Sequence, residues 1–162
     1  MLARELGRRL GLPVVHLDRV FWRPGWVEPP RDEWERLHRE ALAGDAWIAD
    51  GNYGSTMRDR LRWADTIVLI DPSPAVCLWR VFRRQLRWLG RVRDDLPPGC
   101  PERLDARATM AFWRYIWAYR RTRLPRVLAL IEEVQAGRRV EILRSNGEVQ
   151  GFLESIGRES RR

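Results

Sequence analysis

The sequence contains no lysine, so all 30 of its basic residues are arginine. Cysteine and histidine are nearly absent as well: Cys77 and Cys100 have only His16 and His38 as companions, at a spacing that matches no zinc site. The longest apolar runs, such as 66–70, are far shorter than the roughly 20 residues needed to cross a bilayer. These absences exclude a zinc finger and a membrane-spanning helix, and we expect two reduced, structural thiols.

The first residues carry charges and have no apolar stretch of the kind found in secretory signals, so we expect a cytoplasmic protein. A chain of 162 residues fits one domain with a sizeable core. The 10 prolines and 12 glycines are scattered, which argues against a long linker.

Positive charge dominates what is present. The net charge of +8 and the pI near 10.9 indicate an anionic partner, such as nucleotide phosphates, nucleic acid or a membrane surface. The exclusive use of arginine also fits a compositional bias of the source, so charge alone leaves the partner open.

Helical segments alternate with short apolar runs along the whole chain. The expected strands are 13–17, 46–49, 66–70 and 139–143. The expected helices are 2–10, 31–44, 55–63, 74–89, 103–123, 125–137 and a closing helix that starts at Ser145 or Asn146. Residues 22–30 and 90–101 indicate irregular segments, the second exposed and mobile. Nearly all-apolar strands that alternate with helices predict an α/β fold whose parallel sheet is covered on both faces.

Polar residues follow each expected strand. They are His16 and Asp18, the segment 50–53, Asp71, and the segment 144–146. Because ligands of parallel sheets bind at the carboxyl ends of the strands, these residues predict a site at one edge of the sheet.

In this order the motifs resemble a known family. The residues that carry the resemblance are the helix 2–13, His16-Leu-Asp18, Phe21-Trp22, Pro24-Gly-Trp26, Trp47-Ile48, Asp50-Gly-Asn-Tyr53 and an arginine-rich, lid-like region. Together they resemble the adenylate-kinase-like P-loop NTPases, in the branch named DNA topology modulation proteins. The resemblance implies a three-layer α/β/α domain over 1–162, with sheet order 2-3-1-4-5 and a lid-like segment at about 80–123.

The family's phosphate-binding loop, G-x-x-x-x-G-K-[ST], is not in the sequence, and no lysine can replace its lysine. We therefore expect about four strands with the central first strand missing. A mis-assigned start or a truncation is the preferred explanation over evolved loss. Without that strand, either strand edges are exposed or the two flanking strands pair directly.

The resemblance implies ATP-dependent phosphoryl transfer to a nucleotide or another small acceptor, with ATP and Mg²⁺ as the donor complex, impaired here by the missing loop. It gives Asp18 the acceptor hydroxyl or the role of base, and Asp50 a link to Mg²⁺; a turn cap and a plain Asp-Gly turn are the alternatives. His16, Gly51, Asn52 and Tyr53 are expected at the acceptor, although a structural role is favoured for His16. Arg144 and Ser145 are expected at the cofactor, and Asp71 is interpreted as a turn residue.

Arginines form two stripes at helical spacing, and guanidinium groups suit the charge of a transferred phosphoryl group. The stripes are Arg80, Arg84, Arg87 and Arg91, and Arg107, Arg114 and Arg121. We expect Arg80 and Arg84 to act in catalysis and Arg114 and Arg120 to bind substrate, against the alternative of solvated helix faces.

Nine tryptophans, five of them next to an arginine, fit a base-stacking surface, but a role in the core is favoured. A non-catalytic nucleic-acid-binding or DNA-topology-modulating protein is the alternative function, and a decayed fragment is a third.

Overall fold

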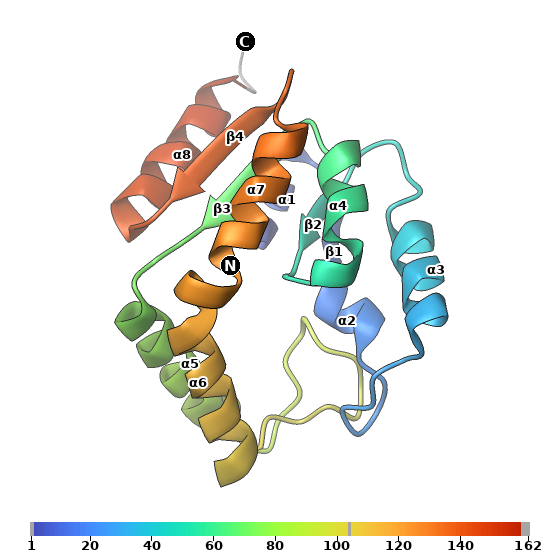
Figure 1. Cartoon of the computed structure of the whole chain (residues 1–162), viewed down its shortest axis with the longest axis vertical. Helices are drawn as coiled ribbons and strands as arrows, with labels where there is room; N and C mark the ends of the chain where they lie inside the picture. Colours follow the sequence, from blue (N-terminus) through green and yellow to red (C-terminus); the bar gives the residue numbers. More distant parts are fainter. Residues whose placement is uncertain (1, 104, 160–162) are drawn as a thin grey trace. The chain divides into compact units, whose positions relative to one another are not determined.

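The computed structural model describes residues 2–103 and 105–159 as a mixed α/β chain (Figure 1). The chain divides into two compact units, and each is described by itself. Unit 1 comprises the described residues of 1–57, 93–100 and 145–162, and unit 2 those of 58–92 and 101–144.

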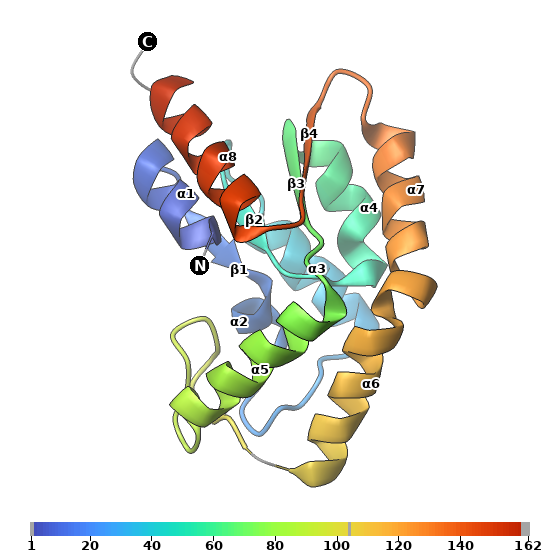
Figure 2. The same cartoon turned by 90° about the vertical axis from the view of Figure 1, so that its left-hand side faces the viewer.

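Unit 1 holds a short parallel strand pair and the helices around it. Its elements are α1 (Leu2–Leu10), β1 (Val14–His16), α2 (Leu17–Phe21), α3 (Arg31–Ala41), β2 (Ile48–Asp50), the start of α4 (Gly54–Trp63) and α8 (Asn146–Glu159). The two strands pair in parallel from Val14 opposite Ile48 to His16 opposite Asp50. Helix α1 packs on both strands and on α8, which lies beside it in Figure 2.

The approach of α1 to β1 requires a residue without a side chain. A Cβ at Gly7 would lie 2.4 Å from Val14 Cγ2, so a larger residue would push α1 away from the strand. Phe152, Leu153 and Ile156 of α8 are buried, as the spacing of apolar residues in the closing helix predicts.

A second apolar cluster in unit 1 is aromatic. The ring of Phe21 lies 5.0 Å from that of Trp34 and 4.6 Å from that of Tyr53, and the rings of Trp34 and Tyr53 are 4.9 Å apart. Leu17 and Trp34 are only 0% and 2% exposed. These contacts fix α2 and α3 around the residues that follow β2.

Unit 2 holds the second strand pair. Its elements are the rest of α4, β3 (Thr66–Ile70), α5 (Pro74–Trp88), α6 (Ala106–Thr122), α7 (Leu124–Val134) and β4 (Arg139–Leu143). All five residues of β3 pair in parallel with β4. Ile67, Ile131 and Val134 form the buried core of this unit, with Val127 and Val140 among the side chains packed against it.

The α/β class and the positions of the four strands are as the sequence predicts, but the sheet is not. The described residues form two separate two-stranded parallel sheets instead of one sheet of about four strands. Sequence patterns show which residues form strands, whereas pairing depends on segments far apart in the chain. The single domain over 1–162 and the lid-like segment stay predictions.

Several boundaries differ from expectation. Helix α5 ends at Trp88, so Arg91 does not continue its arginine stripe. Asp18 lies in the first turn of α2 and not in a turn after the strand. Helix α6 begins at Ala106, three residues later than predicted. Within the described ranges, no helix combines the length and apolarity needed to span a membrane.

Helix α7 offers a matched test of the unit 2 core. Ile131→Ala should lower the free energy of unfolding by about 2–5 kcal/mol, because Ile131 is 5% exposed and its truncation leaves a cavity. Leu128→Ala on the same helix should cost well under half as much, since Leu128 is 39% exposed. Urea unfolding followed by circular dichroism measures both. Equal losses would contradict the assigned orientation of α7.

Candidate functional site

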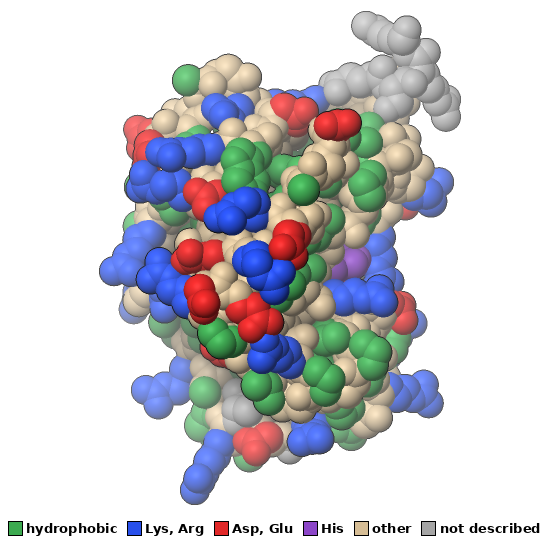
Figure 3. Space-filling view, turned by 90° about the vertical axis from the view of Figure 1, so that its right-hand side faces the viewer, with side chains coloured by type: hydrophobic (Ala, Val, Ile, Leu, Met, Phe, Trp, Pro, Cys, Tyr) green, Lys and Arg blue, Asp and Glu red, His purple; other side chains and the backbone are tan. Residues whose placement is uncertain are grey.

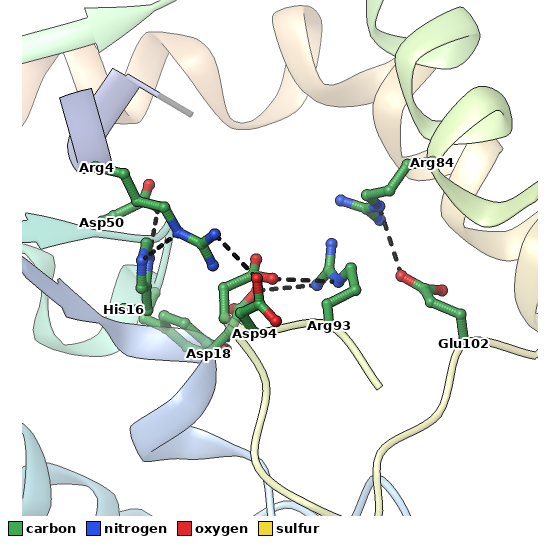
Figure 4. A network of polar contacts seen from close by, with 10 residues as sticks. Arg4, His16, Asp18, Asp50, Arg84, Arg93, Asp94 and Glu102 are labelled. Atoms are coloured by element: carbon green, nitrogen blue, oxygen red, sulfur yellow. Dashed lines mark hydrogen bonds and ion pairs between the residues drawn. The ribbon is translucent and has the colours of Figure 1, made fainter. Parts of the chain in front are cut away.

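The candidate site in unit 1 lies at the carboxyl ends of β1 and β2. His16 is the last residue of β1 and is paired in register with Asp50, the last residue of β2. His16 Nδ1 lies 3.1 Å from Asp50 Oδ2. Figure 4 shows the His16 ring with its contacts to Asp50 and to Arg4.

The contacts of Arg4 indicate which ring nitrogen of His16 accepts a hydrogen bond. Its Nε donates to His16 Nε2 over 3.4 Å, and its Nη1 donates to Asp94 Oδ2 over 3.2 Å. A guanidinium group can only donate, so Nε2 must be the accepting nitrogen of the ring. Nδ1 is therefore the nitrogen that donates to Asp50, so these contacts correspond to the Nδ1–H tautomer.

Asp18 is the second centre of the site. The Tyr53 hydroxyl donates to Asp18 Oδ1 over 2.6 Å, and Arg93 Nη2 lies 3.8 Å from Oδ2. Arg93 Nε is also 3.5 Å from Asp95 Oδ1. Burial raises the pKa of Tyr53 well above its usual range, and the hydrogen bond to the Asp18 carboxylate raises it further. Tyr53 is thus held as a hydrogen-bond donor to a negatively charged group.

The segment 93–100 supplies Arg93 and Asp94, and part of it is buried, contrary to the exposed loop expected from the sequence. Leu96 is 3% exposed and Cys100 is fully buried. Cys100 Sγ donates to the carbonyl oxygen of Arg23 over 3.1 Å, and the amide of Gly25 donates to the carbonyl oxygen of Gly99 over 2.9 Å. These contacts anchor the segment within unit 1, where Arg93 reaches Asp18.

Gly51 shapes the turn between Asp50 and Tyr53. Its φ of 144° is one that glycine adopts far more readily than other residues. A Cβ there would lie 2.9 Å from Leu17 Cβ and 3.3 Å from Tyr53 Cε2. Glycine thus allows the turn to pass closely over Leu17, with Tyr53 directed at Asp18. Asn52 lies between Gly51 and Tyr53 in this turn.

The predicted arginines Arg80, Arg84, Arg114 and Arg120 all belong to unit 2. Arg120 Nη2 donates to Asp71 Oδ2 over 2.8 Å, and this hydrogen bond raises the pKa of Arg120. Asp71 is only 9% exposed and its backbone amide donates to Leu143 O, so it is more than a turn residue: it joins α6 to the end of β3. Arg84 Nε lies 3.5 Å from Glu102 Oε1, a pair also drawn in Figure 4, while Arg80 and Arg114 are exposed.

Arg144 and Ser145 follow β4, where the sequence places them. The Ser145 hydroxyl accepts from the amide of Glu148 over 3.1 Å and lies 3.0 Å from Glu148 Oε1. The Ser145 hydroxyl thus satisfies an amide of the first turn of α8 and caps this helix N-terminus, which gives Ser145 a structural role. The expected contact of both residues with a cofactor stays a prediction.

A metal site with several protein ligands is not found among the described side chains, since no three His, Cys, Asp or Glu residues gather in one place. Mg²⁺ often takes only one or two carboxylates together with water and phosphate oxygens. Asp50, whose side chain is half exposed, has the chemistry for such a contact, and its role as a Mg²⁺ ligand stays a prediction.

Sequence reasoning identified His16, Asp18, Asp50 and Tyr53, which the structure brings together in unit 1. It missed Arg4, Arg93 and Asp94, which lie in the first helix and in the loop 90–101. The only available signal for these residues was the charge of that loop.

Comparison of the chain with protein-family models, with curated proteins and with solved structures gives no match.

The glycine turn can be tested with a matched pair. Gly51→Ala should destabilise the protein by about 1–3 kcal/mol, because the new methyl group clashes with Leu17 and the backbone conformation is unfavourable. Gly44→Ala should leave the free energy of unfolding nearly unchanged, since no atom lies within 4 Å of its added Cβ and its φ is ordinary. Chemical denaturation compares the two; a harmless Gly51→Ala would refute the close turn.

The raised pKa of Tyr53 predicts a decline of stability at high pH. The unfolded chain releases the tyrosine proton near pH 10 while the folded chain retains it, so folding stability falls as pH rises above about 10. Tyr53→Phe should remove this component, and Asp18→Asn should reduce it. Urea midpoints measured from pH 8 to 11 provide the test. A pH dependence unchanged by Tyr53→Phe would contradict the assignment.

Proposed function

We propose that the chain is a kinase-like phosphotransferase of the adenylate-kinase-like P-loop class, and that unit 1 binds the phosphate acceptor. The observation that carries the proposal is the gathering of His16, Asp18, Asp50 and Tyr53 at the carboxyl ends of two parallel strands. Sites of open α/β folds lie at this end of the strands.

The strand pairing supports the same class. A sheet of order 2-3-1-4-5 without its strand 1 contains the neighbouring pairs 2-3 and 4-5. The family's numbering counts the missing strand as strand 1. In that numbering β1 and β2 of this chain correspond to strands 2 and 3, and β3 and β4 correspond to strands 4 and 5. Both pairs are parallel, as a sheet of this kind requires.

Asp18 is the proposed partner of the acceptor hydroxyl. A carboxylate at hydrogen-bond distance can accept the hydroxyl proton as phosphoryl transfer proceeds. Tyr53 and Arg93 face the two oxygens of Asp18 with a hydrogen-bond donor and a cation, which fixes the orientation of its carboxylate. His16 and Arg4 hold the Asp50 carboxylate beside it through the Nδ1–H tautomer.

The donor side does not fit this sequence in the same way. ATP-binding by a P-loop needs a glycine-rich loop with lysine, and the sequence contains neither that motif nor any lysine. We therefore expect γ-phosphate transfer by the chain as printed to be far below an ordinary kinase rate. The proposed function is tested by acceptor binding and not by turnover alone.

Acceptor binding can be measured with a panel of nucleosides and nucleoside monophosphates. At least one member should raise the melting temperature and give a saturable heat of binding by isothermal titration calorimetry. Asp18→Asn and Arg93→Gln should each weaken that binding at least ten-fold, because they remove the proposed hydroxyl partner and its cation.

The controls are Asp32→Asn and Arg36→Gln on α3, both outside the site and exposed. They should leave the affinity unchanged. The proposal fails if no compound of the panel binds, or if the α3 variants weaken binding as strongly as the Asp18 and Arg93 variants.

A further inference from the structure

Unit 2 exposes an unusual number of large apolar side chains on two adjacent helices. Trp79 on α5 is 61% exposed, and Met110 and Trp117 on α6 are 65% and 63% exposed. The other members on these helices are Val76, Phe82, Leu86, Phe112, Trp113 and Tyr115. The rings of Phe82 and Trp113 lie 6.4 Å apart and join the two helices into one surface. The expectation that tryptophans lie mainly in the core is wrong for the exposed Trp63, Trp79, Trp113 and Trp117.

This surface is also strongly cationic. Helices α5 and α6 each contain four arginines, and neither contains an aspartate or a glutamate. Arg84 and Arg120 face Glu102 and Asp71. The side chains of Arg83, Arg87, Arg114 and Arg121 are exposed. Elsewhere arginines and carboxylates are intermixed, as on the face drawn in Figure 3 and in the Arg31–Glu35 and Arg36–Glu40 pairs of α3.

Apolar and cationic residues alternate within the same helical stripe. On α6 the stripe reads Met110, Arg114, Trp117, Arg121, with steps of four, three and four residues. On α5 it reads Trp79, Arg83, Leu86. Aromatic rings therefore stand between guanidinium groups along both helices.

We propose that this surface, formed by Trp79, Phe82, Arg83, Trp113, Arg114, Trp117 and Arg121, binds single-stranded nucleic acid. A single strand presents unpaired base faces and a phosphate at every nucleotide. Rings that alternate with guanidinium groups match this sequence of groups, through stacking on the bases and charge-assisted hydrogen bonds to the phosphates.

Two other occupants fit the surface less well. Helices that lie on membranes separate an apolar face from a cationic face, whereas Arg83 and Arg114 stand among the apolar residues here. A second copy of the same surface would bring arginines against arginines with no carboxylate on either helix to pair with them.

Fluorescence anisotropy with labelled oligo(dT) and oligo(U) of about 16 nucleotides tests the proposal. Binding should weaken as salt rises, with a log–log slope of about −0.7 for each phosphate contact. Trp79→Ala and Trp117→Ala should each weaken binding by roughly five-fold to a hundred-fold through lost stacking. Arg121→Gln should make the salt slope shallower by about 0.7.

Matched controls lie in the same unit. Trp63→Ala removes a half-exposed tryptophan of α4, and Arg126→Gln removes an exposed arginine of α7. Neither should change affinity by more than about two-fold, and urea midpoints should show that all variants are folded. Equal sensitivity of control and surface variants would overturn the proposal.

The competing occupants have their own measurements. Duplex DNA of equal length should bind more weakly than the single strand, since its bases are not free to stack on side chains. Equal affinity for duplex would overturn the stacking mode. Failure to bind any oligonucleotide would overturn the proposal. If the protein then sediments with phosphatidylserine-containing vesicles, and Trp79→Ala and Trp117→Ala abolish this, the surface binds an anionic membrane instead. These readouts use neither the acceptor panel nor the residues of unit 1, so they are independent of the phosphotransferase proposal.

Discussion

The parallel pairing of β1 with β2 is the constraint on which the candidate site depends. Strands of three residues contribute few hydrogen bonds, so their register is fixed mainly by α1, which packs on both. The close contact of Gly7 with Val14 sets that packing. Because the strands are parallel and in register, His16 and Asp50 leave the sheet together and meet at 3.1 Å. A shift of one residue would turn one of the two side chains to the opposite face and separate the pair.

Charge balance explains why these polar groups tolerate one another. Asp18, Asp50 and Asp94 each face a donor: Tyr53, His16 and Arg4, respectively. Without these donors, the three carboxylates would place like charges in one region with no opposite partner. Since hydrogen-bonded groups hold each other's orientation, a ligand would meet side chains already in place and would exchange partners with them. The paired groups come from the first helix, the two strand ends with the residues that follow them, and a loop that is distant in sequence, so the site also ties unit 1 together.

The sequence reveals secondary structure far better than it reveals contacts between residues distant in the chain. Apolar runs and helical periodicity place the four strands and most helices within a few residues, because these signals depend on neighbours along the chain. The polar residues at strand ends could be found for the same reason. Arg4 and Asp94 are 90 residues apart, and no local pattern links them. Phe112, Tyr115 and Tyr119 stand three and four residues apart on α6, and their rings follow one another with centroids 6.2 Å and 5.8 Å apart. Periodicity cannot show that such a face is left uncovered, since burial depends on what the rest of the chain brings to it.

The aromatic residues of α5 and α6 are difficult to explain by folding alone. Core formation in unit 2 rests on Ile67, Ile131 and Val134, and the helices are held by buried or partly buried pairs such as Arg120 with Asp71. Side chains as exposed as Trp79 and Trp117 remove little apolar area from water, so replacing them with polar residues would cost the fold little. Exposed apolar patches also favour non-specific association, which makes them a liability in the absence of a partner. A partner that covers the rings and neutralises the arginines would account for both the exposed apolar area and the positive charge. Each nucleotide of a single strand would supply a base for the rings and a phosphate for the arginines.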